Sequence, residues 1–353
     1  MNISFKKIFK PFLTNAIILL LFLIIIEIFF GYWFDEYNLG PYMREHRMKN
    51  QPTILTQDGN SYKYNYKRNY YGFRGEEMEP ADIKAIIMGG SVVDERYKPE
   101  NFTITGYLNE NFKEHKNYLK IVNAGIEAQS TVGMIYNFKY WFPKLKNFNP
   151  KIILHYVGVN DIAIQPDKHI WNEGGDGHVK NPEKFEVFKD NFKSRSFIFD
   201  SLRIFKFKYL PRKNFVKHDG NINPELKNNF NYITYKAAIE KYDIKRLKKK
   251  YKERLEGYLT RIDILYNSTK KLKSKPIFIT NIGSEGYLEG IFIFNYSLIE
   301  HCKVMNYDCM DIAKKVNAKY LYWSGGAHTT KEGSEMFANL ITKDLVRFLE
   351  NMK

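Results

Sequence analysis

Short apolar runs separated by helix-length segments are the feature that most constrains the fold of this chain. The runs stand at Ala85–Met88, Ile121–Val122, Ile152–Val157 and Ile277–Thr280, with a weaker one near Tyr307–Met310. Buried strands that alternate with helices are typical of a parallel sheet covered on both faces. The sequence therefore predicts an α/β fold over residues 83–350, a three-layer α/β/α sandwich with a parallel central sheet. An amphipathic helix over Glu332–Leu349 is expected to close it.

A long insertion interrupts this alternation after the third apolar run. From Asp161 to Lys275 the chain runs for more than 100 residues, whereas a strand–helix–strand crossover needs about 30. We expect a cap at about residues 162–275 rather than an independent domain. Because the insertion leaves the sheet at the carboxyl edge, where ligands of such sheets bind, the cap is predicted to overhang the site and set substrate choice.

The N-terminal part contains one nearly uninterrupted apolar stretch, Phe12–Phe34. Its 23 residues are enough to span a hydrocarbon core of about 30 Å. Lysines stand at positions 6, 7 and 10 before it, and acidic residues follow at positions 35 and 36. This charge bias predicts a cytoplasmic N-terminus over residues 1–11, a transmembrane signal anchor over 12–34 and a neck or linker over 35–82. The remaining domain is expected outside the cytoplasm, periplasmic or on the outer face.

Glu27 is the one acidic residue within that apolar stretch. It could be a functional carboxylate inside the membrane. Since it stands near the outer end of a single span, we expect it instead to snorkel to the headgroups.

The net charge of +16 is concentrated between Lys241 and Lys275, where 13 Lys and Arg face 4 acidic residues. Apolar residues recur there every three or four positions, which predicts an amphipathic helix with a solvated basic face. A nucleic-acid partner is not expected for an exported domain. An anionic membrane surface or an acidic glycan fits better, and a basic face without a specific partner fits best.

The first apolar run ends on Gly89-Gly90-Ser91. Two glycines allow a sharp turn, and a serine there, before a helix, is open to a ligand. This pattern fits a nucleophile or a tight phosphate-binding turn, and for the serine alone a helix N-cap is the simpler role. The segment lacks both GxxxxGK[ST] and GxGxxG, so the nucleophile is favoured.

Three further residues stand where a serine nucleophile needs partners. Gly125 follows the second apolar run, Asn160 follows the third, and His328 precedes the last predicted helix. Because the carboxyl ends of neighbouring parallel strands meet at one edge, these residues are expected to gather around Ser91. Asp161 is expected to cap the helix that begins there.

These blocks resemble those of the SGNH (GDSL-like) hydrolases, and this chain resembles a membrane-anchored member of that family. Gly89-Gly90-Ser91, Gly125, Gly158-Val159-Asn160-Asp161 and His328-Thr329-Thr330 carry the resemblance, and Asn69-Tyr70-Tyr71-Gly72-Phe73-Arg74-Gly75 also looks like a stretch found in some anchored members. The resemblance implies that Ser91 is the nucleophile and His328 the general base. It implies an oxyanion hole formed by the N–H groups of Ser91 and Gly125 and the side chain of Asn160. No metal or organic cofactor is implied.

The chain departs from the family at one position that matters. Gly325 stands where the family usually has an aspartate three residues before the histidine. The site is then a Ser–His dyad, or another acid such as Asp311 or Glu332 orients His328, or the site is inactive. We expect a slow dyad in which a main-chain oxygen within residues 323–327 holds the second ring nitrogen.

The sequence thus predicts a membrane-anchored, extracytoplasmic serine ester hydrolase that removes O-acetyl or similar acyl groups from a carbohydrate. The alternatives are a polysaccharide O-acyltransferase and a catalytically degenerate glycan-binding module. The other histidines are assigned no chemistry: His155 is expected in the core, and His169 and His178 on the cap.

Cys302 and Cys309 could form a disulfide outside the cytoplasm or remain two buried thiols. Two cysteines without further ligands make no metal site. Neither state bears on the predicted ester chemistry.

Overall fold

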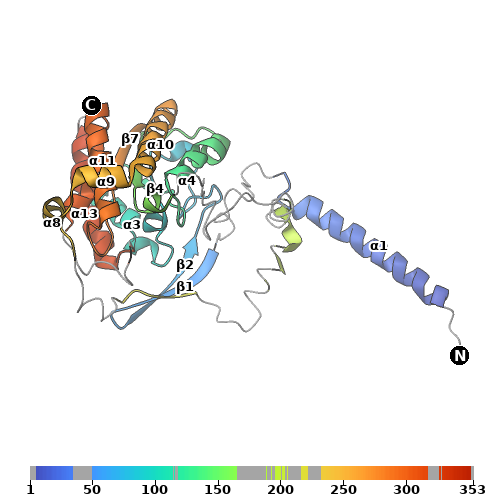
Figure 1. The fold of residues 1–353 in the computed structure, drawn as a ribbon. Coiled ribbons are helices and arrows are strands. Elements are labelled where there is room, and N and C mark those ends of the chain that lie inside the picture. Colours follow the sequence, from blue (N-terminus) through green and yellow to red (C-terminus); the bar gives the residue numbers. More distant parts are fainter. Residues whose placement is uncertain are drawn as a thin grey trace. The chain divides into compact units, whose positions relative to one another are not determined.

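A computed structural model describes residues 5–34, 50–113, 115, 118–164, 216–221, 232–316, 326 and 328–350, together with positions 188, 192, 195–199, 201, 202 and 205. The chain divides into two compact units. The first contains residues 1–41 and 181–214, and the second contains residues 42–180 and 215–353 (Figure 1). The insertion is therefore not one cap, because part of it belongs to the first unit.

The first unit is built on helix α1 (Phe5–Phe30). Within α1, Pro11–Phe30 is long and apolar enough to cross a membrane, and none of that window is buried in the protein. The helix ends four residues before the predicted end of the span at Phe34. The carboxylate of Glu27, expected at the headgroups, accepts hydrogen bonds within this unit from Ser196, Phe197, Ile198 and Trp33.

A five-stranded parallel sheet forms the centre of the second unit. Its strands are β3 (Ala85–Met88), β4 (Ile121–Asn123), β5 (Ile152–Val157), β7 (Lys275–Thr280) and β8 (Cys309–Met310), in the order β4-β3-β5-β7-β8. In β3 and β5 every residue is buried, as expected for strands covered on both faces. The predicted α/β/α fold class is confirmed.

Two helical layers cover this sheet (Figure 1). One contains α3 (Ile104–Phe112) and α13 (Lys331–Glu350), which pack on each other, and the other contains α4 (Thr131–Tyr136), α10 (Lys252–Lys271) and α11 (Glu289–Met305). Shorter helices are α2 (Ser91–Asp94), α8 (Tyr235–Lys241), α9 (Ile244–Lys250) and α12 (Ile312–Lys315). The basic helix predicted as one piece is α9 and α10, because the helix breaks at Tyr251.

A second, three-stranded sheet is formed by parts of the chain predicted as neck and cap. Strands β1 (Asn50–Gln57) and β2 (Asn60–Lys67) form an antiparallel hairpin, and β6 (Val216–Asp219) pairs with β1 in parallel. Asp58 and Gly59 connect the hairpin with φ of 50° and 75°, the left-handed conformation that such tight turns require. Residues 50–67 are therefore part of the second unit rather than a linker.

Cys302 and Cys309 form a disulfide. Cys302 lies in the last turn of α11 and Cys309 begins β8, so the bond ties a covering helix to the edge strand. This decides between the two states that the sequence allowed.

Candidate active site

Ser91 stands directly after β3, at the point where the sheet's connections diverge. Strand β3 lies between β4 and β5, so the chain leaves β3 toward one edge and leaves β5 toward the other. Ligands of open α/β sheets bind at the carboxyl ends of the strands at such a point. The topology therefore gives Ser91 the position of a functional residue.

Close packing explains the two glycines before Ser91. A Cβ on Gly89 would lie 2.4 Å from Val93 Cγ2, and one on Gly90 would lie 2.2 Å from Asn160 Nδ2. The glycines thus allow the turn to fold against both neighbours. The helix that begins at Ser91 is only four residues long, and Glu95, the residue after it, has φ of 45°.

Ser91 and His328 lie within hydrogen-bonding distance. His328 Nε2 is 2.9 Å from Ser91 Oγ, and Ser91 is 8% exposed. Burial lowers the pKa of His328 to about 4, with further lowering from Lys98, His218 and Arg96. The imidazole is therefore neutral near pH 7, which is the form that can accept the serine proton.

A buried lysine holds the backbone that carries His328. Lys98 Nζ donates to the carbonyl oxygen of Thr329 at 3.0 Å and to Thr329 Oγ1 at 2.8 Å, and pairs with Glu95 at 2.5 Å. The ring of Tyr97 lies 4.7 Å from the His328 ring, centroid to centroid. These contacts fix the histidine by its backbone and by its ring face.

The acids proposed as substitutes for the missing aspartate bond elsewhere. Asp311 accepts from Thr280 Oγ1 at 3.1 Å, and Glu332 accepts from Gln57 Nε2 at 2.9 Å. The Gly326 carbonyl accepts from the Ser284 N–H at 2.7 Å. The other residues of the 323–327 segment, Gly325 included, lie outside the described residues.

Two of the three expected oxyanion donors keep a hydrogen that no described residue accepts. Among the described residues no acceptor takes the Ser91 N–H. Asn160 Nδ2 donates one hydrogen to the Gln129 carbonyl at 3.0 Å and lies against Gly90. An amide nitrogen carries two hydrogens, so its second remains for a ligand.

Gly125 differs from its expected role. Its N–H donates to Asn123 Oδ1 at 2.9 Å, and a Cβ there would lie 2.4 Å from the Asp94 nitrogen. Gly125 is a close-packing glycine beneath the serine turn, and its N–H is not available to an oxyanion in this structure.

Ala128 is a candidate that the sequence did not single out. It has φ of 55°, a conformation that favours glycine. The Gln129 N–H closes the turn onto the Ile126 carbonyl at 3.1 Å, and no described acceptor takes the Ala128 N–H. This turn packs against Gly90 through Gln129. An alanine gives no sequence signal for such a backbone, so only the structure could identify it.

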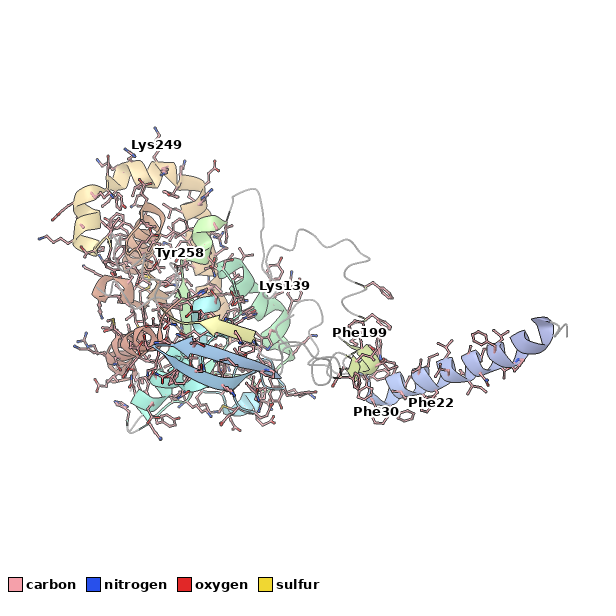
Figure 2. All side chains as sticks on the ribbon, turned by 90° about the horizontal axis from the view of Figure 1, so that it is seen from below. Phe22, Phe30, Lys139, Phe199, Lys249 and Tyr258 are labelled. Carbon is pink, nitrogen blue, oxygen red and sulfur yellow. A yellow bond between two sulfur atoms is a disulfide. The ribbon has the colours of Figure 1, made fainter. Side chains whose placement is uncertain are left out.

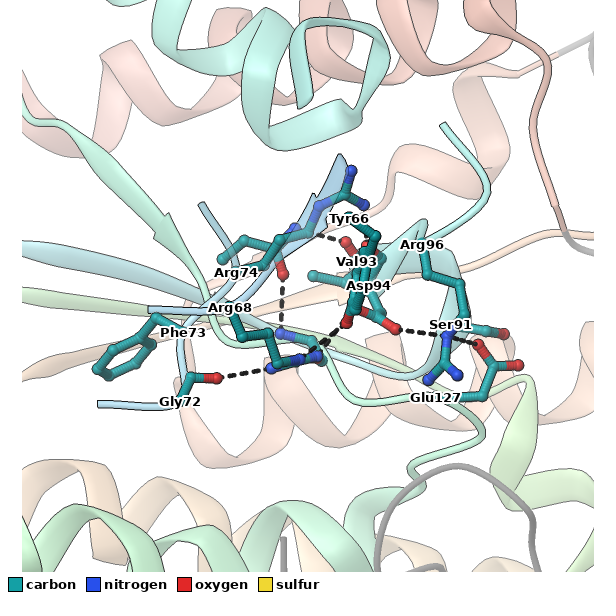
Figure 3. Close-up of polar contacts among 12 residues, drawn as sticks. Tyr66, Arg68, Gly72, Phe73, Arg74, Ser91, Val93, Asp94, Arg96 and Glu127 are labelled. Atoms are coloured by element: carbon teal, nitrogen blue, oxygen red, sulfur yellow. Dashed lines mark hydrogen bonds and ion pairs between the residues drawn. The ribbon is translucent and has the colours of Figure 1, made fainter. Parts of the chain in front are cut away.

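Arg68 and the Asn69–Gly75 stretch that follows it support the serine turn through a buried charge cluster (Figure 3). Arg68 bonds Asp94 at 2.8 Å and the Gly125 carbonyl at 2.5 Å. Arg74 donates to the Lys98 carbonyl at 2.6 Å and to Glu100 at 2.7 Å. Burial alone would raise the pKa of Asp94, but three arginines outweigh it and lower that pKa. The stretch therefore locks the segment that follows Ser91.

Polar side chains surround the serine. Arg96 lies 3.1 Å from Asp94 Oδ2 and 3.2 Å from Glu127 Oε2, and both Arg96 and Glu127 are partly exposed (Figure 3). His218, on β6, has its ring centroid 5.8 Å from that of Tyr97. Burial and Arg96 lower the pKa of His218. Part of the insertion thus reaches the site through β6.

The other residues considered in the sequence analysis take no part in the candidate site where the structure describes them. His155 is fully buried and bonds Thr269 at 2.9 Å, so it is a core residue as expected. Asp161 does not cap its own helix, because its carboxylate accepts from Thr131 at the start of α4. His169 and His178, predicted on the cap, lie outside the described residues. In the described part of the chain, no cluster of His, Cys, Asp and Glu could hold a metal ion.

Comparison with known proteins finds similarity to solved structures alone. No family model matches the sequence, and no curated protein matches it. Solved structures do match. The structure resembles G-D-S-L esterases.

Three such structures illustrate the likeness. A member of the lipolytic G-D-S-L family from Veillonella parvula is 12% identical, covers 75% of this chain and 98% of its own, and has a TM-score of 0.41. An acetylxylan esterase from Geobacillus stearothermophilus is 11% identical, with 74% and 93% covered and a TM-score of 0.41. An esterase from Pseudoalteromonas sp. is 9% identical, with 76% and 99% covered and a TM-score of 0.43. Because these identities and TM-scores are low, the function proposed for this chain rests on the geometry of its own site.

Proposed function

We propose that this protein is a serine ester hydrolase anchored in a membrane by α1, with Ser91 as nucleophile and His328 as general base. The observation that carries the proposal is the 2.9 Å separation of Ser91 Oγ and His328 Nε2. A neutral histidine at that distance from a serine at a sheet switch point is what acyl transfer requires.

The reaction follows from these contacts. His328 Nε2 takes the proton of Ser91 Oγ as that oxygen attacks the acyl carbon, and the protonated ring then donates it to the departing alcohol. Water repeats the sequence on the acyl-serine and releases the acid. The Ser91 N–H and Asn160 Nδ2 stabilise the negative oxygen of both tetrahedral intermediates, with the Ala128 N–H as a third donor.

The dyad needs no carboxylate if the histidine is already fixed in place. In serine proteases the aspartate sets the tautomer of the histidine, and losing it costs about 10⁴-fold. Here Lys98 holds the residue after His328, and Tyr97 packs on the ring. We propose that these contacts replace part of the aspartate's function.

The proposed substrate is an O-acetylated or similarly acylated carbohydrate outside the cytoplasm. Arg96, Glu127 and His218 favour a polar alcohol over a long apolar chain, because partly exposed charged or polar groups are poor partners for hydrocarbon. The apolar length of α1 supports the proposed membrane anchor, and the lysines before it support the proposed orientation.

Acetate release from O-acetylated polysaccharides tests this function. Full-length protein in detergent micelles should release acetate, and Ser91→Ala should abolish the release. Transfer of acetyl groups to an added oligosaccharide without acetate release would indicate an acyltransferase. Polysaccharide binding with neither reaction would indicate a degenerate binding module.

A further inference from the structure

Glu27 lies three residues before the end of α1, and four donors surround its carboxylate. Ser196 Oγ donates at 2.5 Å, the N–H groups of Phe197 and Ile198 donate at 3.1 Å each, and Trp33 Nε1 donates at 3.0 Å. A carboxylate on an apolar helix is costly unless such donors satisfy it. Glu27 therefore docks residues 196–198 onto the end of α1.

Further contacts strengthen this docking within the first unit. The Tyr32 N–H donates to the Arg195 carbonyl at 2.8 Å. The ring centroids of Phe30 and Phe197 lie 5.4 Å apart, as do those of Trp33 and Phe192. Figure 2 shows Phe199 on the segment beside Phe30 at this end of α1. The described residues from Phe188 to Phe205, here called the docking segment, thus include several that pack on the helix end.

The docking segment exposes large apolar side chains. Outside residues 12–34, every described phenylalanine that is exposed belongs to it: Phe188, Phe192, Phe199 and Phe205. Phe199 is 44% exposed, Leu202 61% and Phe205 56%. The intervals between these residues are those of one face of a helix, and residues 197–199, 201 and 202 are helical.

We propose that the docking segment is an interfacial element that lies in the headgroup–acyl boundary of the lipid bilayer crossed by α1. None of the apolar window of α1 is buried in protein, as expected for a helix that contacts hydrocarbon. The bonds of Glu27 fix residues 196–198 within one helical turn of the end of α1, at the depth where the bilayer surface begins. Amphipathic helices with aromatic residues on the apolar face bind at that depth.

The charges of the docking segment fit the same partner. Between Phe188 and Phe205 the sequence has four basic residues, at positions 189, 193, 195 and 203, against two acidic ones, at positions 190 and 200. Cations beside an apolar face attract anionic lipid headgroups. The inference rests on α1 spanning a membrane and does not depend on the ester hydrolase.

The consequence is that the protein is attached to the membrane twice, first by α1 and again by the docking segment of the insertion. The chain passes between the two units after residues 41, 180 and 214. If the docking segment lies in the bilayer surface, three chain segments connect the Ser91 unit to membrane-bound residues, where a simple signal anchor would provide one. The insertion is then an anchor as well as a contributor to the site.

Spin labels test the depth of this segment. Full-length protein is placed in nanodiscs of phosphatidylcholine and phosphatidylglycerol at a ratio of about 3:1, conditions under which apolar faces insert. Labels are attached at Phe199→Cys and Leu202→Cys, with Ile24→Cys in α1 as the lipid control and Ile239→Cys, 40% exposed on α8, as the matched control. Collisions with oxygen, which concentrates in lipid, and with a water-soluble nickel chelate are measured.

We expect the labels at 199 and 202 to resemble the Ile24 label, with high oxygen and low nickel accessibility. Nickel accessibility as high as at Ile239 would overturn the proposal. Low accessibility to both reagents would also overturn it, because a protein partner would then cover the face.

A second measurement tests the role of Glu27. The Glu27→Leu substitution removes the acceptor and keeps α1 apolar. Hydrogen exchange of the Phe197 and Ile198 amides should become faster while α1 stays inserted. Unchanged exchange would contradict docking through Glu27.

Discussion

Lys98 Nζ lies 3.0 Å from the carbonyl oxygen of Thr329, the residue that follows His328. Burial lowers the pKa of Lys98, but the adjacent Glu95 favours its charged form. A buried ion pair is thus built behind the histidine, where it positions the backbone without contacting the reacting atoms. This contact compensates for the absence of a carboxylate at Gly325 in the proposed mechanism.

We predict that the double variant Lys98→Met, Glu95→Gln lowers kcat about 10²-fold, the loss typical of a displaced catalytic group. Removing both partners avoids an unpaired buried charge. The acid limb of the pH profile should move to higher pH, since Lys98 no longer lowers the pKa of His328. Lys113→Met, Glu110→Gln removes an exposed pair and should change neither quantity. If the acid limb of the double variant stayed at the pH of wild type, Lys98 would have a structural role and would not influence the pKa of His328.

The pH dependence of kcat/KM reports His328 in the free enzyme. Because its pKa is lowered to about 4, the base is protonated and inactive only below that pH. We predict that kcat/KM rises through about pH 4 and is level toward neutrality. Measurement between pH 3 and 8 with a soluble ester checks this. A limb near 6.5, the ordinary histidine pKa, would mean that the ring is not desolvated.

Substitution of Asn160 tests the proposed oxyanion hole. Asn160→Ala should lower kcat/KM by about 10²–10³-fold, the usual loss for one such donor. The thermal midpoint should change little, because the side chain makes one hydrogen bond, to the Gln129 carbonyl. Asn111→Ala, in an exposed hydrogen bond, is the matched control. A loss below threefold would exclude Asn160 from the transition state.

The charge cluster beneath Ser91 should dominate stability. Asp94→Asn leaves Arg68 without its buried carboxylate partner, and such a loss costs about 3–5 kcal/mol. Urea unfolding of the full-length protein should show a midpoint well below that of wild type. Glu300→Gln removes the exposed pair with Lys303 and should leave the midpoint nearly unchanged. Similar midpoints for both variants would contradict the cluster's role.

The sequence could predict the central sheet because each buried parallel strand is a short apolar run that can be recognised without knowledge of its neighbours. Ala85–Met88 and Ile152–Val157 have the predicted bounds, since glycines and polar residues mark where each strand ends. Ser91, Asn160 and His328 could be proposed because each follows a strand or precedes a helix. Their meeting at one edge then follows from the parallel order of the strands.

The remainder depends on contacts between residues far apart in the chain. The pairing of β6 with β1 joins residues 216–219 to the segment predicted as a neck, and no local sequence pattern predicts this pairing. Gly125 looked like an oxyanion donor, but whether its N–H is free depends on the rotamer of Asn123. The hydrogen bond from Ser196 to Glu27 could not be predicted, because the two residues stand 169 positions apart.

Covalent labelling with a fluorophosphonate tests the activated serine most directly, since such probes phosphonylate serines whose proton a neighbouring base removes. Full-length wild type, Ser91→Ala and His328→Ala are incubated with the probe, and the modified residue is located by mass spectrometry. The proposed mechanism predicts one adduct on Ser91 in wild type, none in Ser91→Ala and strongly slowed labelling in His328→Ala. An unlabelled wild type, or equal rates in wild type and His328→Ala, would contradict it.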